Sequence, residues 1–548
     1  MMEVKIYDTT LRDGSQREGI SFSVTDKLKI VKELDKLGIH YIEGGFAGSN
    51  PKDVEFFERV KKIKLKNSKI VAFGSTRRKN IRAEDDPNLR ALIDSGVRAA
   101  CVVGKCWHVH VENALRTTRE ENINMVGESI AFLKENGLEV FFDAEHFFDG
   151  YKGDSGYAID VLRAAQDAGA DCLVLCDTIG GALPHEVKEI IESVKSKIDA
   201  PLGIHAHNDS ECAVANTLIA VQVGASQVQG TINGYGERCG NANLCSVIPA
   251  LQLKLGIEVI QPEQLKLLTE ASHLVSEIAN LSPYPQQAYV GQSAFAHKAG
   301  LHTSAIERAD SSYAHINPGL VGNIQRVVMS ELAGKSTVIL KAQELGIDLS
   351  DDPRRVTDIL NRVKGLEHVG YHFEAADASF EILLRKALGI HPTFFKLERF
   401  RVIMEKREDG RVATEATIKL QVGGRVVIET AEGNGPVNAL DKALRKAIGS
   451  VYPALDDIEL TDFKVRVLDE KKGTGAATRV LVESGDGKKT WGTIGVSENI
   501  IEASWRALID SVEYGLMHKR VHEENGLNGL NGEPVADNQV TELPNYQF

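Results

Sequence analysis

Short apolar runs alternate with helix-like stretches through the first half of the chain, and this rhythm restricts the fold more than any other feature. The runs are rich in β-branched and aromatic residues, as buried strands are. Eight of them occur, at 4–7, 40–43, 69–73, 99–103, 138–142, 172–176, 202–204 and 227–230. Eight strand–helix units in about 250 residues match the dimensions of a (β/α)8 TIM barrel.

The stretches between the runs have helical period, and several of them end in glycine. Gly38, Gly137, Gly169 and Gly224 each precede the next strand-like run. Glycine is favoured at such helix ends because the residue there adopts left-handed backbone angles. A doubly wound open sheet is the alternative, but its glycine-rich phosphate-binding turn does not follow the first strand. We therefore predict an α/β fold with a TIM-barrel catalytic domain at residues 1–260.

Polar residues gather at the carboxyl ends of the predicted strands. TIM-barrel enzymes build their active sites on that face, because the loops there carry the functional side chains. The residues are Arg12 and Asp13 after the first strand, Glu145 after the fifth, Thr178 after the sixth, His205 and His207 at the seventh, and 234–241 after the eighth. Their common placement indicates an enzyme.

The seventh strand ends with two histidines two residues apart. Side chains on a strand alternate between faces, so the imidazoles of His205 and His207 are expected to point the same way. Together with the Asp13 carboxylate they predict a divalent-metal site, and Asn241 adds an amide oxygen or reaches the metal through water. This set suits Mg²⁺ or Mn²⁺, with Zn²⁺ also possible. Such a cation can chelate a 2-oxo acid, while Arg12 stabilises the oxyanion that forms on attack.

Taken alone, each of these features also has an explanation that involves no catalytic or binding role. The sequence Arg12-Asp13-Gly14 is also a common charged turn. Two histidines at this spacing are more often surface or hydrogen-bonded residues, and a glycine-rich loop is weak evidence by itself. Placed together on one face of a barrel, the motifs favour function over these readings.

The composition excludes several classes of protein. A net charge of −13 argues against general nucleic-acid binding. No run of about 18 apolar residues occurs, so we expect no membrane span. The first residues lead straight into a strand without a targeting segment, which predicts a cytoplasmic protein. The seven cysteines are dispersed, as expected for reduced thiols in a reducing compartment.

The second half of the chain has a different pattern. Residues 261–397 read as helical linker subdomains, with the clearest helices at 263–281 and 377–388. Residues 398–517 predict a C-terminal α+β domain in which a βββα unit occurs twice, at an offset of 64 residues. Such a duplication favours pseudo-two-fold packing and a dimer. Residues 518–548 have little to bury and are predicted to be a disordered tail.

Two motifs resemble signatures of a known family. The first is 11–16, Leu-Arg-Asp-Gly-Ser-Gln, and the second comprises 205–209, His-Ala-His-Asn-Asp, with 236–241, Gly-Glu-Arg-Cys-Gly-Asn. They resemble the acetyl-CoA-dependent 2-oxo-acid condensing enzymes of the DRE-TIM metallolyases, which include 2-isopropylmalate, homocitrate and citramalate synthases. The segments 43–53, 75–79 and 310–313 look most like the citramalate synthase branch. The resemblance covers the chain to about residue 516.

The resemblance implies a role for each matching residue. In such enzymes acetyl-CoA is deprotonated at its methyl group, adds to the ketone of a 2-oxo acid (here pyruvate) and loses CoA by hydrolysis. A homodimer is implied, because the segment that bears the histidine reaches a neighbouring barrel. The implied residues are Asp13, His205, His207 and Asn241 for the metal; Arg12 as catalytic cation; Glu145, His302 and Tyr313 for proton removal; Thr178 and Gln16 for the 2-oxo acid; and Gly236, Glu237 and Arg238 for acetyl-CoA.

Several alternatives stay open at the level of the sequence. A 2-isopropylmalate synthase acting on 2-oxoisovalerate is the nearest rival, followed by a homocitrate synthase. A lyase of the hydroxymethylglutaryl-CoA type would cleave the same kind of bond, and a non-catalytic metabolite sensor would explain the C-terminal domain. That domain resembles the regulatory domain of 2-isopropylmalate synthases, which implies feedback inhibition by isoleucine; purely structural dimerisation is the other reading.

Overall fold

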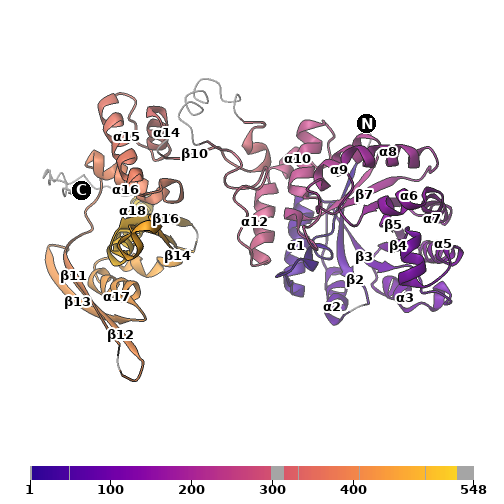
Figure 1. Cartoon of the computed structure of the whole chain (residues 1–548), viewed down its shortest axis with the longest axis horizontal. Coiled ribbons are helices and arrows are strands. Elements are labelled where there is room, and N and C mark those ends of the chain that lie inside the picture. The colour runs from indigo at the N-terminus through magenta and orange to yellow at the C-terminus, as the bar shows by residue number, and fades with distance from the viewer. Residues whose placement is uncertain are drawn as a thin grey trace. The chain divides into compact units, whose positions relative to one another are not determined.

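A computed structural model of the chain divides it into two compact units (Figure 1). It describes residues 3–48, 50–297, 314–330, 333–406, 408–487 and 489–527. The first unit comprises 1–295 with 314–325, and the second comprises 296–313 with 326–548. The predicted domain boundary at 260 therefore falls inside the first unit.

The first unit is a closed barrel of eight parallel strands in sequential order. Asp8 at the end of the first strand pairs with Ile42 on one side and Gly230 on the other, which closes the ring. The predicted TIM barrel is thus confirmed. The strands are β1 (Lys5–Asp8), β2 (Tyr41–Phe46), β3 (Lys69–Ser75), β4 (Ala99–Lys105), β5 (Glu139–Glu145), β6 (Cys172–Asp177), β7 (Leu202–Ala206) and β8 (Gln227–Gly230).

Helices surround the barrel (Figure 1), and local signals mark where they begin and end. Ser23 caps the first helix: its side chain accepts the backbone N–H of Asp26, and the Asp26 carboxylate accepts the backbone N–H of Ser23. Gly38 ends that helix at a φ of 91°, a left-handed angle that suits glycine. The helices are α1 (Val24–Leu37), α2 (Pro51–Val60), α3 (Pro87–Asp94), α4 (His108–His110), α5 (Arg119–Glu135), α6 (Phe147–Gly153), α7 (Ser155–Asp167), α8 (Pro184–Lys195), α9 (Ala213–Gln222) and α10 (Leu244–Lys254).

The single helix expected at 263–281 is two helices in the structure. They are α11 (Pro262–Leu265) and α12 (Leu268–Ile278). The break comes where the N–H of Leu267 bonds to the carbonyl of Gln264, a tighter three-residue turn. Asn233, in the loop after the eighth barrel strand, donates to the Ser272 carbonyl at 2.9 Å, which ties α12 to the barrel.

The second unit begins with a small parallel pair and three helices. The pair is β9 (Ala296–His297) with β10 (Arg326–Val327), and the helices are α14 (Lys335–Glu344), α15 (Pro353–His368) and α16 (Asp377–Leu388). The last of these has the bounds predicted from the sequence.

The duplicated βββα unit is present in the second unit. Two antiparallel three-stranded sheets are each followed by a helix. The helix residues that align at the 64-residue offset, such as Ala443 and Ala507, are fully buried in both copies. The elements are β11 (Phe395–Lys406), β12 (Val412–Val422), β13 (Arg425–Gly433) and α17 (Pro436–Ile448), then β14 (Glu459–Val467), β15 (Thr478–Gly485), β16 (Thr490–Ser497) and α18 (Ile500–Leu527).

The predicted start of the disordered tail at 518 is wrong. Helix α18 continues to Leu527, and Leu516 and Met517 before the expected boundary are buried. Residues 528–548 lie outside the described part of the chain. Across the described residues, no helix combines the length and apolarity needed to cross a membrane.

Candidate active site

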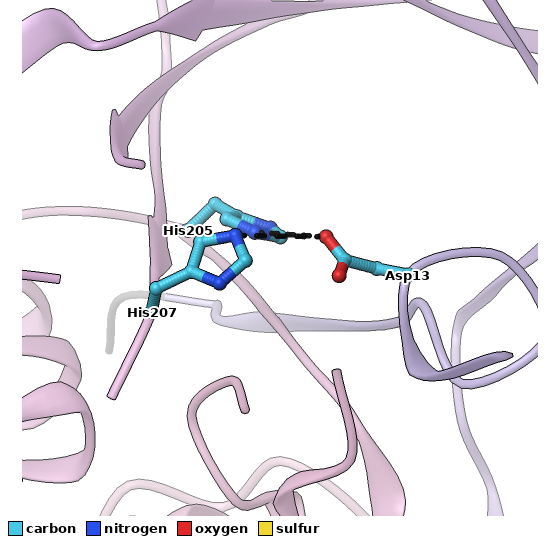
Figure 2. A group of neighbouring side chains, drawn as sticks. All are labelled: Asp13, His205 and His207. Carbon is cyan, nitrogen blue, oxygen red and sulfur yellow. Dashed lines mark ion pairs between the residues drawn. The ribbon is translucent and has the colours of Figure 1, made fainter. Parts of the chain in front are cut away.

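Asp13, His205 and His207 converge at the carboxyl end of the barrel (Figure 2). Asp13 Oδ2 lies 3.5 Å from His205 Nε2 and 3.8 Å from His207 Nε2. Their potential ligand atoms all lie within 4.8 Å of one another, and all three residues are buried. The structure thus brings together the three residues that the sequence assigned to a metal.

Two different local structures position this cluster. His205 lies on β7, and His207, just past the end of that strand, pairs with Asn241 in an isolated bridge. Asp13 sits in a tight turn after β1, where the N–H groups of Arg12 and Gly14 both bond to the carbonyl of Thr9. The turn therefore aims the carboxylate back across the mouth of the barrel.

The electrostatics of the cluster differ from residue to residue. Burial lowers the pKa of His205, but the Asp13 carboxylate outweighs this and raises it, so metal binding must displace a proton from this imidazole. Burial raises the pKa of Asp13, but the Arg12 guanidinium and His205 outweigh this and hold that pKa well below its usual range. Burial, together with repulsion from His205, lowers the pKa of His207 to about 4. Asp13 is therefore ionised and His207 neutral near pH 7, the forms in which both side chains bind metals.

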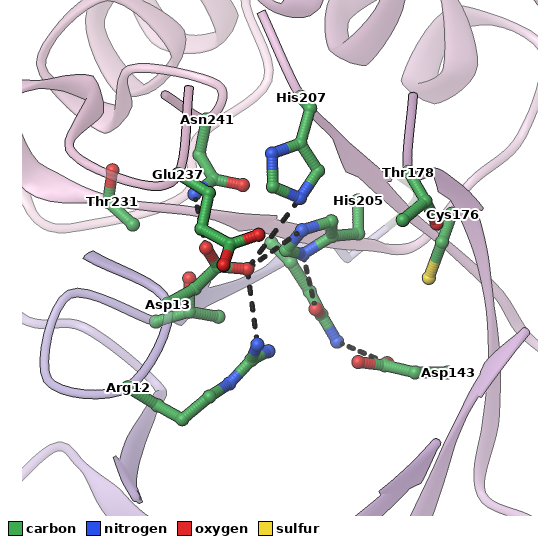
Figure 3. A network of polar contacts seen from close by, with 12 residues as sticks. Arg12, Asp13, Asp143, Cys176, Thr178, His205, His207, Thr231, Glu237 and Asn241 are labelled. Atoms are coloured by element: carbon green, nitrogen blue, oxygen red, sulfur yellow. Dashed lines mark hydrogen bonds and ion pairs between the residues drawn. The ribbon is translucent and has the colours of Figure 1, made fainter. Parts of the chain in front are cut away.

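Asn241 completes the donor set (Figure 3). Its amide nitrogen donates to Asp13 Oδ1 at 3.0 Å and to the Tyr235 carbonyl at 3.1 Å. Its Oδ1 atom is buried and has no partner among the described residues. Gly236 permits this approach, since a Cβ there would lie 2.1 Å from Asn241 Nδ2. Two imidazoles, a carboxylate and an orphaned amide oxygen fit a divalent cation.

Arg12 is held rigidly beside the cluster. Its Nη1 bonds to Asp13 Oδ2 at 3.1 Å and its Nε bonds to Glu43 Oε2 at 2.7 Å. The guanidinium lies over the Phe73 ring, 3.9 Å from the centroid. Tyr7 in turn donates its hydroxyl to Glu43 at 2.9 Å. A cation with so many contacts is pre-organised to stabilise a developing negative charge.

Glu145 ends β5 on the same face of the barrel and forms an ion pair with Lys105 at the end of β4. Both residues line a cavity of about 570 Å³, together with Val103, Leu115 and Met125. The lining of this space also includes the basic residues Arg77, Arg78 and Lys79.

Thr178 follows β6 and is oriented by its neighbour in space. The backbone N–H of His146 donates to Thr178 Oγ1 at 2.8 Å, so the hydroxyl hydrogen is available to another acceptor. His146 has a φ of 55°, a left-handed angle that is unusual for a residue with a side chain. Arg238 bonds to the Thr178 carbonyl at 2.7 Å and to Asp209 at 2.8 Å, which ties the loop after β8 to the loop after β6.

The remaining expected residues are less enclosed. Gln16 is exposed and borders a cavity of about 200 Å³ with Arg12, Ser15 and Phe46. Glu237 is exposed in the loop after β8 (Figure 3). His302 and Tyr313 lie outside the described residues.

Three buried residues near the cluster were not assigned a role from the sequence. They are Glu43 on β2, Asp143 on β5 and Gln229 on β8, and none is more than 3% exposed. A signal for Asp143 was present: in 141–145, Phe-Phe-Asp-Ala-Glu, it lies two residues before Glu145 and hence on the same face of the strand. Charged or amide residues inside otherwise apolar strands are the pattern that would have found all three.

Known families match successive parts of the chain. The family described as HMGL-like matches residues 3–275. The homocitrate synthase post-HMGL domain-like family matches 289–370, and the LeuA allosteric (dimerisation) domain matches 374–516.

Whole-chain relatives extend these matches. A protein of Geobacter sulfurreducens is 57% identical over 95% of this chain and 98% of its own length. A protein of Aquifex aeolicus is 53% identical over 96% of this chain and 99% of its own, and one of Synechocystis sp. is 51% identical over 93% and 96%. Each of the three is an (R)-citramalate synthase.

Proposed function

The chain belongs to the (R)-citramalate synthase family, and we propose on this premise how its barrel performs the reaction. The enzyme is an acyltransferase that condenses acetyl-CoA with pyruvate. Atoms balance as acetyl-CoA, pyruvate and water giving (R)-citramalate and CoA. A carbon–carbon bond forms between the acetyl methyl carbon and the ketone carbon, and water breaks the thioester.

The observation that carries the site assignment is the convergence of Asp13, His205 and His207 beside Arg12. A divalent cation held by these three residues and Asn241 would polarise the ketone of the 2-oxo acid as a Lewis acid. Arg12, fixed by Glu43, supplies the positive charge that the new alkoxide requires. Mg²⁺ and Mn²⁺ suit this mixed nitrogen and oxygen set.

Pyruvate binding is assigned to residues that surround the cluster. The Thr178 hydroxyl, which accepts the His146 N–H at one of its two lone pairs, donates its hydrogen to the pyruvate carboxylate. Gln16 borders the cavity on the other side of Arg12 and contributes an amide. This arrangement orients the ketone toward the acetyl group before attack.

Proton removal from the acetyl methyl group is assigned to Glu145 and His302, with Tyr313 assisting. Glu145 opens onto the cavity of about 570 Å³, which supplies room for the acetyl thioester. The loop residues Gly236, Glu237 and Arg238 are proposed to border acetyl-CoA on the opposite side of the mouth. Deprotonation of such a weak carbon acid needs a carboxylate whose position is held, and Lys105 holds this one.

The first test compares substrates by release of the CoA thiol. Acetyl-CoA is offered with pyruvate, 2-oxoisovalerate or 2-oxoglutarate, each with and without Mg²⁺ or Mn²⁺. Metal-dependent release that is strongest with pyruvate is expected. Stronger release with 2-oxoisovalerate would favour the 2-isopropylmalate reaction, and metal-independent release would contradict the assigned centre.

The second test separates the proposed base from an ordinary ion pair. Glu145→Gln is expected to lower kcat by about 10²- to 10⁴-fold. Glu139→Gln is the matched control, because Glu139 begins the same strand, has the same 25% side-chain exposure and pairs with Lys69 in place of Lys105. Equal kcat values for the two variants would remove Glu145 from the mechanism.

The C-terminal duplicated domain is proposed to form a homodimer and to bind isoleucine as a feedback inhibitor. Its match to an allosteric dimerisation domain supports this role. Truncation after residue 396 should therefore abolish inhibition by isoleucine while leaving some activity. Persistent inhibition of the truncated enzyme would place the isoleucine site elsewhere.

A further inference from the structure

A chain of hydrogen bonds crosses the barrel interior behind the proposed metal site. His205 on β7 and Gln229 on β8 face each other as register partners. His205 Nδ1 lies 2.9 Å from Gln229 Oε1, and Gln229 Nε2 donates to Asp143 Oδ1 at 2.9 Å. In the view of Figure 3, His205 lies between Asp13 and Asp143.

The first bond determines which nitrogen of His205 carries hydrogen. An amide oxygen only accepts hydrogen bonds, so His205 Nδ1 must donate to Gln229 Oε1. In the neutral imidazole the lone pair is then on Nε2, the atom that faces Asp13 at 3.5 Å. If the Gln229 amide had the opposite orientation, its NH₂ group would donate to His205 Nδ1. The hydrogen of the neutral ring would then be on Nε2, and that nitrogen could not bind a metal.

The second bond determines which way the Gln229 amide points. Asp143 Oδ1 accepts the hydrogen bond from the NH₂ end of Gln229, which leaves the amide oxygen for His205. Gln229 is fully buried and Asp143 is 3% exposed, so water does not compete for either group. Reversing the amide would place two acceptors against each other at Asp143, without solvent to separate them.

His207 provides a comparison inside the same site. Its Nδ1 atom is buried and has no partner among the residues the structure describes. Only one of the two imidazoles is therefore held in a defined tautomer by the protein. The strength of the site should depend on the groups behind His205 and not on any behind His207.

We propose that Gln229 and Asp143 are positioning residues that hold His205 in the tautomer required for metal binding. This inference rests on the metal site proposed above and adds two residues to it. Neither residue is assigned to touch the metal or the substrate; both act through His205. Outer partners of this kind commonly change metal affinity by 10- to 100-fold.

The test measures Mn²⁺ binding to the full-length protein by electron paramagnetic resonance, without substrates. Gln229→Met removes the hydrogen bonds at similar side-chain length, and Asp143→Asn allows the Gln229 amide to take either orientation. Each is expected to weaken Mn²⁺ binding about 10- to 100-fold. Pulsed measurements should also show weaker ¹⁴N coupling from coordinated imidazole in both variants.

Cys101→Ala is the matched control. Cys101 is fully buried and contacts Asp143, but it lies off the path to His205. Its variant should bind Mn²⁺ as the unaltered protein does. Unfolding temperatures of all variants check that the barrel remains intact, and Asp143→Asn serves as the nearly isosteric case if Gln229→Met is poorly folded.

Two results would overturn the inference, and they have different meanings. Failure of the unaltered protein to bind Mn²⁺, or unchanged binding in His205→Ala, would remove the metal site itself. Binding that is the same in Gln229→Met and Asp143→Asn as in Cys101→Ala, with unchanged ¹⁴N coupling, would leave the metal site and refute the role of the two positioning residues.

Discussion

The barrel interior has two levels with opposite chemistry. Near the amino ends of the strands it is filled by a lower layer, defined as Tyr41, Val71, Ala99, Phe141 and Cys172, all buried. The Tyr41 and Phe141 rings meet edge to face, 4.9 Å between centroids. This is the packed apolar core expected inside such barrels.

One layer above, toward the carboxyl ends of the strands, the same interior becomes polar. The upper layer is defined as Arg12, Glu43, Asp143, His205 and Gln229, which bond to one another in pairs from β2, β5, β7, β8 and the turn after β1. Along β5 the sequence passes from packing at Phe141 to the proposed positioning residue Asp143 and the proposed base Glu145. Since strand side chains repeat every two residues, one face of a strand carries all three roles.

The comparison predicts that residues important for stability and residues important for activity lie at different levels of the barrel interior. Apolar side chains in the lower layer contribute by burial, while the polar pairs above return less net free energy because their desolvation offsets their attraction. Variants in the lower layer should therefore change the free energy of unfolding, and variants in the upper layer should change the reaction. The predictions below are ways to test this division.

Replacement of Asp13 should have the largest effect. Asp13→Asn removes the charge that faces both histidines. We expect kcat/KM to fall on the order of 10³-fold, which corresponds to a loss of several kcal/mol of transition-state stabilisation. Thermal unfolding should change little compared with this loss. Steady-state kinetics with a metal titration measures the effect, and an unchanged titration would count against Asp13 as a ligand.

Replacement of Phe141 should do the reverse. Phe141→Ala leaves a cavity among buried rings, and the free energy of unfolding is expected to fall by about 3–5 kcal/mol. Denaturant unfolding followed by circular dichroism measures this. Phe141→Leu, which conserves more volume, should cost less. A loss of kcat at temperatures where Phe141→Ala is still folded would break the division between the layers.

The upper layer should also contribute to how stability depends on pH. Burial raises the pKa of Glu43 and of Asp143 above their ordinary values of 4.5 and 3.8. The folded state then retains protons that the unfolded state has released. The free energy of unfolding therefore decreases as pH rises above about 4.5. The slope is at most about 1.4 kcal/mol per pH unit for each proton.

Glu43→Gln should flatten this pH dependence in the metal-free protein, because it removes one of the two carboxylates. Phe141→Ala should shift the stability curve without changing its slope. Unfolding midpoints measured in a chelator from about pH 5 to about pH 8 test both statements. An unchanged slope in Glu43→Gln would show that this carboxyl does not titrate there.

The smallest effect is expected where the two layers touch. Tyr7 packs on Phe141 with 5.7 Å between ring centroids and donates its hydroxyl to Glu43 at 2.9 Å. Tyr7→Phe keeps the ring and removes the hydrogen bond, at an expected cost of about 1 kcal/mol in unfolding free energy. Urea unfolding measures the cost, and a change much larger than this would mean that the layers do not act separately.

Much of the architecture follows from local patterns in the sequence. The eight strands, the duplicated βββα unit and the glycines at helix ends each depend on a few neighbouring residues. The helix at 377–388 was predicted with its observed bounds. The sequence-based bounds differ from the structure at the break after α11 and at the continuation of α18 to Leu527.

The candidate site was only partly predictable. Asp13, His205 and His207 stand out because motifs and strand ends mark them, and Asn241 lies in a marked loop. Asp143 and Gln229 lie 86 residues apart in the sequence, yet their side chains bond to each other. Nothing in the sequence around either residue indicates the other as its partner. The two come within reach of each other because the barrel closes between β1 and β8.

The sequence by itself determined the barrel, its repeated strand–helix order and the identity of the residues at its carboxyl end, because periodicity and turn chemistry act over short distances. Only the tertiary structure decided which nitrogen of His205 faces Asp13, that Arg12 is braced by Glu43, and that Glu145 opens onto a cavity. These depend on side chains from separate strands meeting within hydrogen-bond distance, which the pairing of neighbouring strands and the closure of the ring together decide.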